Sequence, residues 1–254
     1  MSDKVDAGAV LAAIARIAAA SDESDVLEVL YEAKDLLRVQ QAVFASFIRD
    51  DLSTESFRFL VAADAAWCLA YQRQWWYSND AWLLYAAANS EPTSDSHIPI
   101  RTDHQRAARD LATQFGVKSA FIVPAPAAGG VSRVGVLMLG SSLEGHFDQD
   151  RTQLAVVKPL ARSLAMELHE WWVRKTRGDL LASSRIGQDD LELLRFERAG
   201  LSTKEIARKL GTTAASVDSR FQRLNAKLGT PNRKATARLA MEYGLIDDSQ
   251  SHVL

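Results

Sequence analysis

The side chains with the clearest chemical pattern form a basic row near the carboxyl end of the chain. Ser216, Arg220, Arg223 and Lys227 follow one another at steps of four, three and four residues, which places them along one side of an α-helix. An apolar row beside them has the same steps: Val217, Phe221, Leu224 and Leu228. Basic and hydroxyl side chains bind phosphate oxygens. The spacing therefore predicts a helix that packs through one side and contacts a nucleic-acid backbone through the other.

The residues before this helix predict how the chain positions it. Ser202 and Glu205 have the spacing of a capping box, in which each side chain hydrogen-bonds a backbone N–H at the start of a helix. We expect that helix over residues 203–210, then a turn at Gly211, and Thr213 as the cap of the second helix. This is the pattern of a helix-turn-helix, whose second helix enters the DNA major groove. On periodicity alone, a surface helical hairpin with a solvated charged face fits equally well.

The residues across segment 186–246 favour the helix-turn-helix. Those that match a family pattern follow one another without gaps: Asp190, Leu194, Gly200, Glu205-Ile206-Ala207, Val217, Lys227-Leu228-Gly229, Asn232-Arg233 and Gly244-Leu245-Ile246. On these residues the segment resembles the C-terminal domain of LuxR-type transcriptional regulators. The resemblance implies an all-α four-helix domain over residues 186–254 that binds a two-fold operator in double-stranded DNA. It also admits RNA polymerase as a further partner.

In such a domain we expect the exposed side chains to divide by role. Four basic residues would mainly hold phosphates: Lys204, Arg220, Arg223 and Lys227. Four others would face bases or their surroundings: Ser216, Asp218, Ser219 and Gln222. Asp218 is unexpected, since many relatives carry a basic residue there. Its carboxylate either accepts a hydrogen bond from a cytosine amino group or weakens the attraction to phosphate.

Composition limits the remaining possibilities. The chain has 254 residues, 47% of them hydrophobic and 24% charged, which is ordinary for one large or two modest globular domains. From Arg185 onward there are 12 Lys or Arg and 9 Asp or Glu, a net of +3, whereas the rest holds 18 and 23, a net of −5. The single cysteine, Cys68, excludes an intrachain disulfide framework. No apolar run is long enough for a membrane span, and the amino terminus does not resemble a signal peptide, so we expect a cytoplasmic protein without membrane contact.

The first part of the chain predicts an α/β sandwich, a central antiparallel sheet with helices on both sides, over residues 1–173. The expected helices cover residues 7–20, 24–37, 65–77, 103–115 and 148–175. The expected strands cover residues 42–48, 57–61, 119–124 and 133–139. Polar loops are expected at 49–55 and 90–96, and a linker at 174–185 joins this part to the helix-turn-helix.

Known catalytic and metal-binding patterns are missing from the sequence. It contains no P-loop, G-x-G-x-x-G, H-E-x-x-H or G-x-S-x-G, and its five histidines lack metal-ligand spacing. A phosphorylated receiver domain would need an early acidic pair after a first strand, and the chain begins with two helices instead. We therefore predict neither an enzyme nor a metal site. A non-DNA interaction protein or an enzyme that uses an apolar pocket ranks as the weakest alternative.

The region before the helix-turn-helix contains a second pattern that is similar to a known family, formed by Trp67, Tyr71 and Asp80. The pattern Trp67-x-x-x-Tyr71 followed by Asp80 is similar to the autoinducer-binding domain of the same LuxR-type family. The resemblance implies that the tryptophan donates its indole N–H to the lactone carbonyl of an acyl-homoserine lactone. The aspartate would accept from the ligand amide, and the tyrosine would line the acyl pocket. Tryptophans at helical spacing also pack in ordinary cores, and we assign Trp75 and Trp76 to the core or the surface.

Several positions depart from the family pattern. Ala63 stands where many members have tyrosine, Ala81 stands where proline is usual, and the loop 91–100 lacks a tryptophan. Met138 stands where Ser or Thr is frequent, so it joins the candidate pocket residues. We expect two aromatic residues to supply the missing wall: Trp82 and Tyr85. The departures leave open a regulator that is ligand-independent or responds to a non-lactone small molecule.

The sequence thus predicts a transcriptional regulator with a small-molecule signal and no other cofactor. We expect a homodimer that forms through the helix 148–175. We expect its apolar positions to be more numerous than one monomer core requires: Leu154, Val157, Leu160, Leu164, Leu168 and Trp172.

Overall fold

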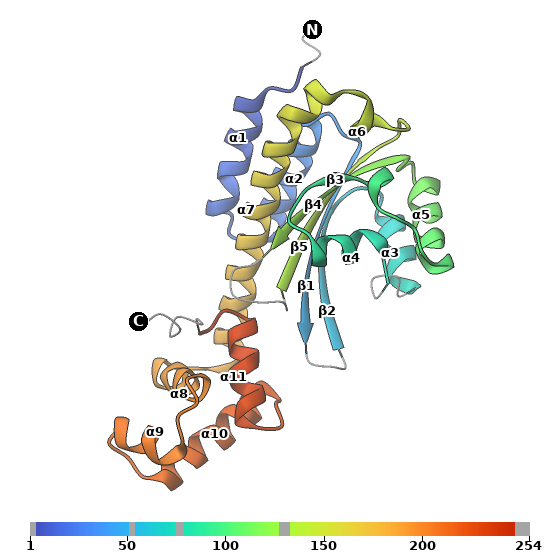
Figure 1. Cartoon of the computed structure of the whole chain (residues 1–254). Helices are drawn as coiled ribbons and strands as arrows, with labels where there is room; N and C mark the ends of the chain where they lie inside the picture. Colours follow the sequence, from blue (N-terminus) through green and yellow to red (C-terminus); the bar gives the residue numbers. More distant parts are fainter. Residues whose placement is uncertain (1–3, 51–53, 75–78, 127–132, 247–254) are drawn as a thin grey trace. The chain divides into compact units, whose positions relative to one another are not determined.

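The computed structural model describes residues 4–50, 54–74, 79–126 and 133–246 (Figure 1). The chain divides into two compact units, Met1–Trp171 and Trp172–Leu254, and each is described by itself. Among the described residues, no helix combines the length and the apolar character needed to cross a membrane.

The first unit is built on an antiparallel sheet with strand order β2-β1-β5-β4-β3. Its strands are β1 (Gln41–Asp50), β2 (Thr54–Ala62), β3 (Thr93–Ser94), β4 (Ser119–Pro126) and β5 (Arg133–Ser141). Their register places Met138 of β5 between Val43 of β1 and Ile122 of β4. Side chains two residues apart on a strand share a face, so Ala45 and Val136 extend the same apolar surface.

Helices cover both faces of this sheet, which confirms the predicted sandwich. One face carries α1 (Ala7–Ala15), α2 (Glu23–Leu36) and the first part of α7 (Arg151–Ser184), and the other carries α3 (Ala65–Arg73), α4 (Ala81–Ala88) and α5 (Asp103–Gln114) (Figure 1). Asp6, Asp22 and Asp64 cap α1, α2 and α3, each accepting from backbone N–H groups of the first turn. The short elements are η1 (Arg16–Ala19), η3 (Asp95–His97) and α6 (His146–Gln149).

The expected loops around the sheet are shorter than predicted. Strands β1 and β2 extend to Asp50 and from Thr54, because ladder pairing continues through the polar positions. The predicted loop 90–96 contains β3, which pairs with β4 at the sheet edge. The end of the predicted helix 65–77, including Trp75 and Trp76, lies outside the described residues.

The long helix is displaced toward the carboxyl end relative to the prediction. Asp150 interrupts the helix that was predicted from residue 148. Its side chain accepts from the N–H groups of Thr152 and Gln153 and so caps α7. The helix then continues to Ser184, so residues 174–184 of the predicted linker are helical. Gly178 has open space around it, and an ion pair between Lys175 and Asp179 spans this turn. A single exposed glycine costs a helix only about 1 kcal/mol, which does not stop it here.

The apolar row on α7 is buried within the first unit. Val157, Leu160, Leu164 and Leu168 are at most 5% exposed. The expectation that this row exceeds what one monomer needs was therefore wrong for these four positions, whereas Leu154 near the start of the helix is half-buried. The outward side of α7 presents a different set of side chains: Ala155, Val156, Pro159, Ser163 and Met166.

In its described part, the second unit holds α8 (Gln188–Arg198), α9 (Thr203–Lys209), α10 (Ala214–Leu228) and α11 (Arg233–Glu242). This confirms the predicted all-α helix-turn-helix. Ser202 and Glu205 form the expected capping box, and Thr213 caps α10. Gly211 and Gly229 both have φ near +60°, which only glycine adopts without strain. Val217, Phe221 and Leu224 bury one side of α10 against α8, α9 and α11.

Candidate functional site

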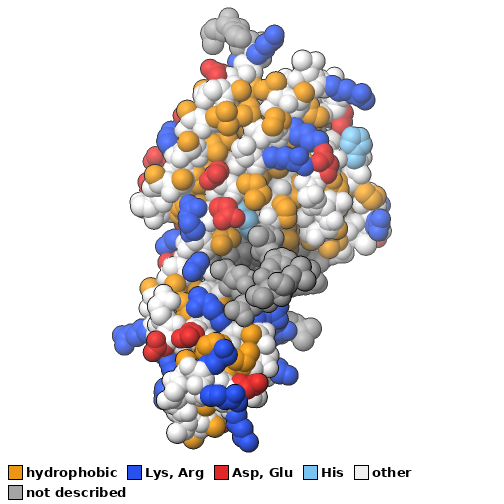
Figure 2. All heavy atoms as spheres, turned by 60° about the vertical axis from the view of Figure 1, so that its left-hand side comes forward, with side chains coloured by type: hydrophobic (Ala, Val, Ile, Leu, Met, Phe, Trp, Pro, Cys, Tyr) orange, Lys and Arg blue, Asp and Glu red, His pale blue; other side chains and the backbone are white. Residues whose placement is uncertain are grey.

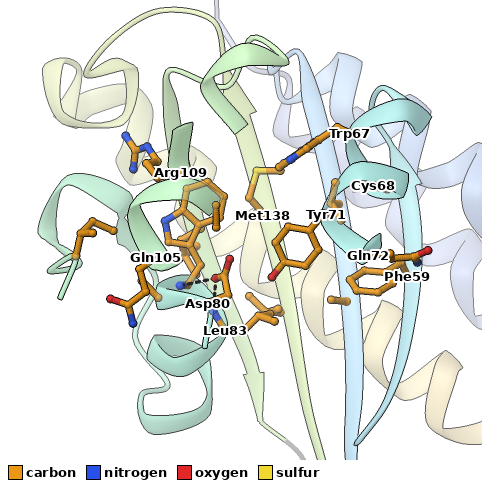
Figure 3. Close-up of a pocket in the computed structure, with 18 residues that line it drawn as sticks. Phe59, Trp67, Cys68, Tyr71, Gln72, Asp80, Leu83, Gln105, Arg109 and Met138 are labelled. Carbon is orange, nitrogen blue, oxygen red and sulfur yellow. Dashed lines mark hydrogen bonds between the residues drawn. The ribbon is translucent and has the colours of Figure 1, made fainter. Parts of the chain in front are cut away.

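A cavity of about 70 Å³ lies in the first unit between the sheet and the layer of α3, α4 and α5 (Figure 3). Its floor is the apolar sheet surface: Val43, Ala45, Phe59, Ile122, Val136 and Met138. Five of the six predicted pocket residues line it: Trp67, Tyr71, Asp80, Trp82 and Met138. The fold brings them together because α3 and α4 lie side by side over the same strands.

Asp80 is the polar centre of the cavity. It is the N-cap of α4, and its Oδ1 accepts from the N–H of Trp82 at 2.7 Å and of Leu83 at 3.1 Å. The Tyr71 hydroxyl donates to the same carboxylate. Burial is the largest effect and raises the pKa of the Asp80 carboxyl, although these hydrogen bonds oppose the rise. Burial, followed by the charge of Asp80, raises the pKa of Tyr71 as well.

Trp67 supplies the cavity's unpaired donor. Asp64 caps α3, and Trp67 and Tyr71 lie one turn apart on the same side of that helix. Trp67 is 6% exposed, and its indole Nε1 has no hydrogen-bond partner. Figure 3 shows this nitrogen pointing toward the thioether of Met138, which is only a weak acceptor. A buried N–H without a partner carries a desolvation cost that a ligand carbonyl would remove.

Tyr85 is placed elsewhere by the structure. Its hydroxyl donates to the carbonyl of Glu91 at 2.7 Å, and it does not line the cavity. The Glu91 carboxylate in turn forms ion pairs with Lys158 and Arg162 of α7. Tyr85 sits one turn after Trp82 on α4, but its hydroxyl reaches the following loop, which the sequence alone could not show.

The structure adds Gln105 and Arg109 of α5 to the cavity wall. The Arg109 guanidinium lies 5.7 Å from the centre of the Trp82 ring and pairs with the buried carboxylate of Asp95, whose other oxygen accepts from the N–H of Ala120. Gln105 is a buried polar residue within the buried stripe of an otherwise amphipathic helix, a signal that sequence analysis could have used. No group of three or more potential metal ligands occurs among the described residues.

In the second unit, α10 presents the predicted contact residues to different degrees. Asp218, Gln222, Arg223 and Lys227 are exposed, as is Lys204 on α9. The remaining three are half-buried: Ser216, Ser219 and Arg220. Figure 2 shows Lys and Arg side chains over the visible surface of this unit.

Ion pairs separate the basic residues into two groups. Arg220 pairs with Asp189 at 3.5 Å, and Lys227 pairs with Asp190 at 3.4 Å and donates to the carbonyl of Arg185 at 2.9 Å. Both therefore tie α10 to the start of α8. Arg223, by contrast, donates to the hydroxyl of Ser219 on its own helix at 3.1 Å and forms no ion pair with another described residue.

Asp218 takes part in a polar chain on the opposite flank of α10. The hydroxyl of Thr203 lies 3.5 Å from the Asp218 carboxylate and accepts from Arg233 at 2.9 Å. Arg233 also pairs with the buried Glu197 and lies over the ring of Phe221. The first turn of α9 is thus held beside α10 by side chains from α8 and α11.

Comparison with known proteins agrees with this architecture. A family model described as the autoinducer binding domain matches residues 22–171, so the chain belongs to that family. A crystal structure of Escherichia coli SdiA has a TM-score of 0.69 at 17% identity and covers 93% of this chain and 97% of that one. SdiA in complex with octanoyl-rac-glycerol has a TM-score of 0.68 at 17% identity, covering 97% and 99%.

A third solved structure covers a smaller share of the chain. The N-acylhomoserine lactone dependent LuxR family factor CepR2 from Burkholderia cenocepacia has a TM-score of 0.55 at 14% identity and covers 65% of this chain and 94% of that one. No curated protein sequence matches the chain significantly. At these identities the structural likeness establishes the fold. Together, these findings give a chain that has an autoinducer binding domain and shares the fold of the SdiA structures along most of its length.

Proposed function

We propose that this chain is a LuxR-type transcriptional regulator, which binds an acyl-homoserine lactone in the cavity of its first unit and double-stranded DNA through its helix-turn-helix. The unpaired indole N–H of Trp67, beside the buried Asp80 in an apolar cavity, is the observation that supports the ligand. The lactone carbonyl of the ligand would accept from Trp67, and the ligand's amide N–H would donate to Asp80. The acyl chain would lie on the apolar floor, as small amphipathic ligands do in such pockets. We propose no catalytic step, and no other cofactor is needed.

A second candidate ligand is an acyl chain with another head group. Ala63 and Ala81 stand at positions where many family members carry Tyr and Pro, so this cavity offers a lactone ring fewer contacts. One similar structure, of SdiA, contains octanoyl-rac-glycerol. An ester has a carbonyl for Trp67 but no N–H for Asp80, so this candidate would use the site only in part.

For DNA, we propose that Arg223 and Lys204 contact phosphates, while Ser219 and Gln222 face the bases. Arg220 and Lys227 reach phosphates only if their ion pairs with α8 rearrange. Ser216 and Asp218 flank this face, and Asp218 would accept from a cytosine amino group. Two-fold operators are bound by two-fold dimers.

The proposed homodimer would use apolar surface left exposed on the first unit. Val156 and Met166 of α7 and Leu11 of α1 are 36–50% exposed. Figure 2 shows apolar atoms over the visible part of this unit. We further propose that the DNA-bound regulator acts on RNA polymerase in the cytoplasm.

Thermal unfolding of the purified full chain tests the ligand. A lactone such as N-octanoyl-homoserine lactone, supplied at 100 times its Kd, should add about 2.7 kcal/mol to the free energy of unfolding. Trp67→Phe should lose most of this gain because it removes the donor. Tyr85→Phe is the matched control and should keep it, since Tyr85 lies outside the cavity. If the protein shows no shift across a panel of acyl-homoserine lactones, the lactone proposal fails.

A salt-dependent gel shift tests the DNA proposal. Arg223→Ala should weaken binding to all sequences and reduce the steepness of the salt dependence by about one phosphate contact. Arg195→Ala changes an exposed basic residue of α8 and should leave the shift intact. If DNA affinity depends neither on salt concentration nor on Arg223, α10 has a different role.

A further inference from the structure

A chain of polar side chains connects the interior of the second unit to the exposed Asp218 on α10. It begins at Glu197 of α8, which is buried and pairs with Arg233 of α11 at 3.0 Å. The Arg233 guanidinium lies 5.6 Å from the centre of the Phe221 ring and donates to the hydroxyl of Thr203 at 2.9 Å. That hydroxyl lies 3.5 Å from the Asp218 carboxylate. The exposed end of the chain is therefore tied to the packed core of the unit.

The direction of these hydrogen bonds determines what the Thr203 hydroxyl can do. A guanidinium has only donors, so Arg233 occupies an acceptor position of the hydroxyl oxygen. The single hydroxyl proton then remains for Oδ1 of Asp218, because a carboxylate has only acceptors. Asp218 is exposed, so its remaining acceptor positions are open to a donor outside the chain. Thr203 thus holds the carboxylate in one orientation without consuming it.

The place of Asp218 on α10 suits a contact with a base. It lies in the second turn, and a recognition helix contacts base edges through its amino-terminal part. In the major groove cytosine presents an amino group, from which a carboxylate accepts. Thymine and guanine present carbonyl oxygens instead, and the amino group of adenine stands beside the acceptor N7, which opposes a carboxylate. A carboxylate held in one orientation therefore distinguishes cytosine from the other bases, whereas a freely rotating one would turn away to water.

Resting on the proposed DNA binding, we propose that Thr203 and Arg233 are positioning residues that hold Asp218 toward a cytosine, and so determine one base pair of each operator half-site. Arg233 is itself fixed on two sides, by the buried Glu197 and by the ring of Phe221. The Thr203 hydroxyl therefore keeps its proton directed at Asp218 when DNA arrives. An Asp218 that merely repels phosphates would weaken binding to every sequence and would give no preference for one base.

Thr203 allows matched substitutions. Thr203→Val keeps a branched side chain of similar size and removes the hydroxyl, whereas Thr203→Ser keeps the hydroxyl. Thr203→Ala removes the same hydroxyl without β-branching and serves where Thr203→Val fails to fold. Asp218→Ala removes the carboxylate from an exposed position, so the fold should tolerate it. Gln222 is exposed one turn further along α10, and Gln222→Ala should alter the preference at a different base pair.

Selection of bound sequences from a random double-stranded DNA library tests the inference, with the purified full chain in the presence and absence of N-octanoyl-homoserine lactone. Gel-shift competition with single base-pair variants of the selected site then gives the affinity ratio at each position. We expect one position of the native half-site to prefer cytosine over thymine at least about tenfold. Asp218→Ala should reduce that ratio to about twofold or less and Thr203→Val to about threefold or less, while Thr203→Ser and Gln222→Ala should preserve it.

The outcomes separate this inference from the proposed function. If the native protein selects no sequence in either condition, the DNA proposal fails and the inference with it. If it selects a site whose base preferences all survive in Asp218→Ala, the inference is overturned and the DNA proposal stands. A folded Thr203→Val or Thr203→Ala that keeps the cytosine ratio would overturn the positioning role. Equal weakening of all sequences in those variants would overturn it too, because Thr203 would then hold a phosphate.

Discussion

The two units differ in how completely their buried groups are satisfied. In the helix-turn-helix unit, a capping box at Ser202 satisfies the start of α9, and glycines occupy two left-handed turns. Ion pairs connect α10 to α8. The first unit instead buries Trp67 with an unpaired N–H and Asp80 with a raised pKa, around a cavity. The polar groups of the first unit therefore face into a cavity. The basic side chains of the second unit face outward from helices whose ends and cores are satisfied within the unit.

This difference indicates where ligand free energy can act. A ligand that fills the cavity adds stability only to the unit whose buried groups it satisfies. The described residues of the helix-turn-helix unit enclose no such cavity with an unpaired buried donor. We therefore expect packing and helix caps to supply the stability of that unit. Substitutions made separately in each unit test whether the stability of the two units differs in this way.

The largest effect is expected in the core of the second unit. Phe221 is 3% exposed and packs at the centre of α10, so Phe221→Ala should cost about 3–5 kcal/mol. Urea unfolding should show this loss together with the loss of DNA binding. Lactone binding by the first unit should persist, and if it disappears as well, the two units are not independent in stability.

The two faces of the sheet should respond differently to added volume. A Cβ at Gly135 would lie 2.6 Å from His169 Nδ1 and 3.0 Å from Phe44 Cζ, so Gly135→Ala should cost about 1–3 kcal/mol. Val136, the next residue, faces the cavity, and Val136→Ile should cost less than about 0.5 kcal/mol there. Thermal unfolding of both variants without ligand measures the difference. Equal losses would show that the cavity face is as tightly packed as the α7 face.

A smaller effect is expected at the capping box. Ser202→Ala leaves the N–H of Glu205 without its side-chain acceptor and should cost about 1 kcal/mol in the second unit. Ser202→Asp keeps an acceptor at the N-cap and should restore most of that loss. Hydrogen exchange of the α9 amides reports it directly, and unchanged exchange in Ser202→Ala would show that the cap contributes little.

The smallest effect depends on pH. Because burial raises the pKa of Asp80, the folded chain binds that proton more readily than the unfolded chain. The native protein therefore holds this stability at low pH and loses it as pH rises through the raised pKa. Asp80→Asn can keep the two α4 cap bonds without the charge. Without ligand, it should melt higher than the native protein near about pH 8, and the gap should shrink toward about pH 4. A gap that widens on acidification would contradict this.

Local sequence rules predicted the second unit almost completely. The capping box, Gly211, Thr213 and the apolar row of α10 each depend on neighbours within a few residues, and short-range chemistry determines them. The partners of Arg220 and Lys227 were missed, because Asp189 and Asp190 lie some 30 to 40 positions earlier in the chain. Their proximity follows from how α8 packs on α10.

The first unit was predictable in class but less so in detail. Alternating and helical patterns indicated the sandwich, and the likeness to a family placed Trp67, Tyr71 and Asp80 in one pocket. The extension of α7 through residues 174–184 was not foreseen, since one glycine among polar residues resembles a linker. Asp95 begins η3 within the predicted loop 90–96, which has no periodic pattern, so its burial beside Arg109 could not be inferred.

The sequence alone therefore determined the types of secondary structure and the chemical groups that the chain carries. Periodicity, caps and turn residues act over a few positions, and they specify helices, strands and the helix-turn-helix. The tertiary structure alone decided which groups stay unpaired. It set the Trp67 N–H against the Met138 thioether, turned Tyr85 toward Glu91, and left Arg223 outside the ion pairs that engage Arg220 and Lys227. Whether a donor is satisfied depends on residues distant in sequence, and only the packed fold brings them within reach.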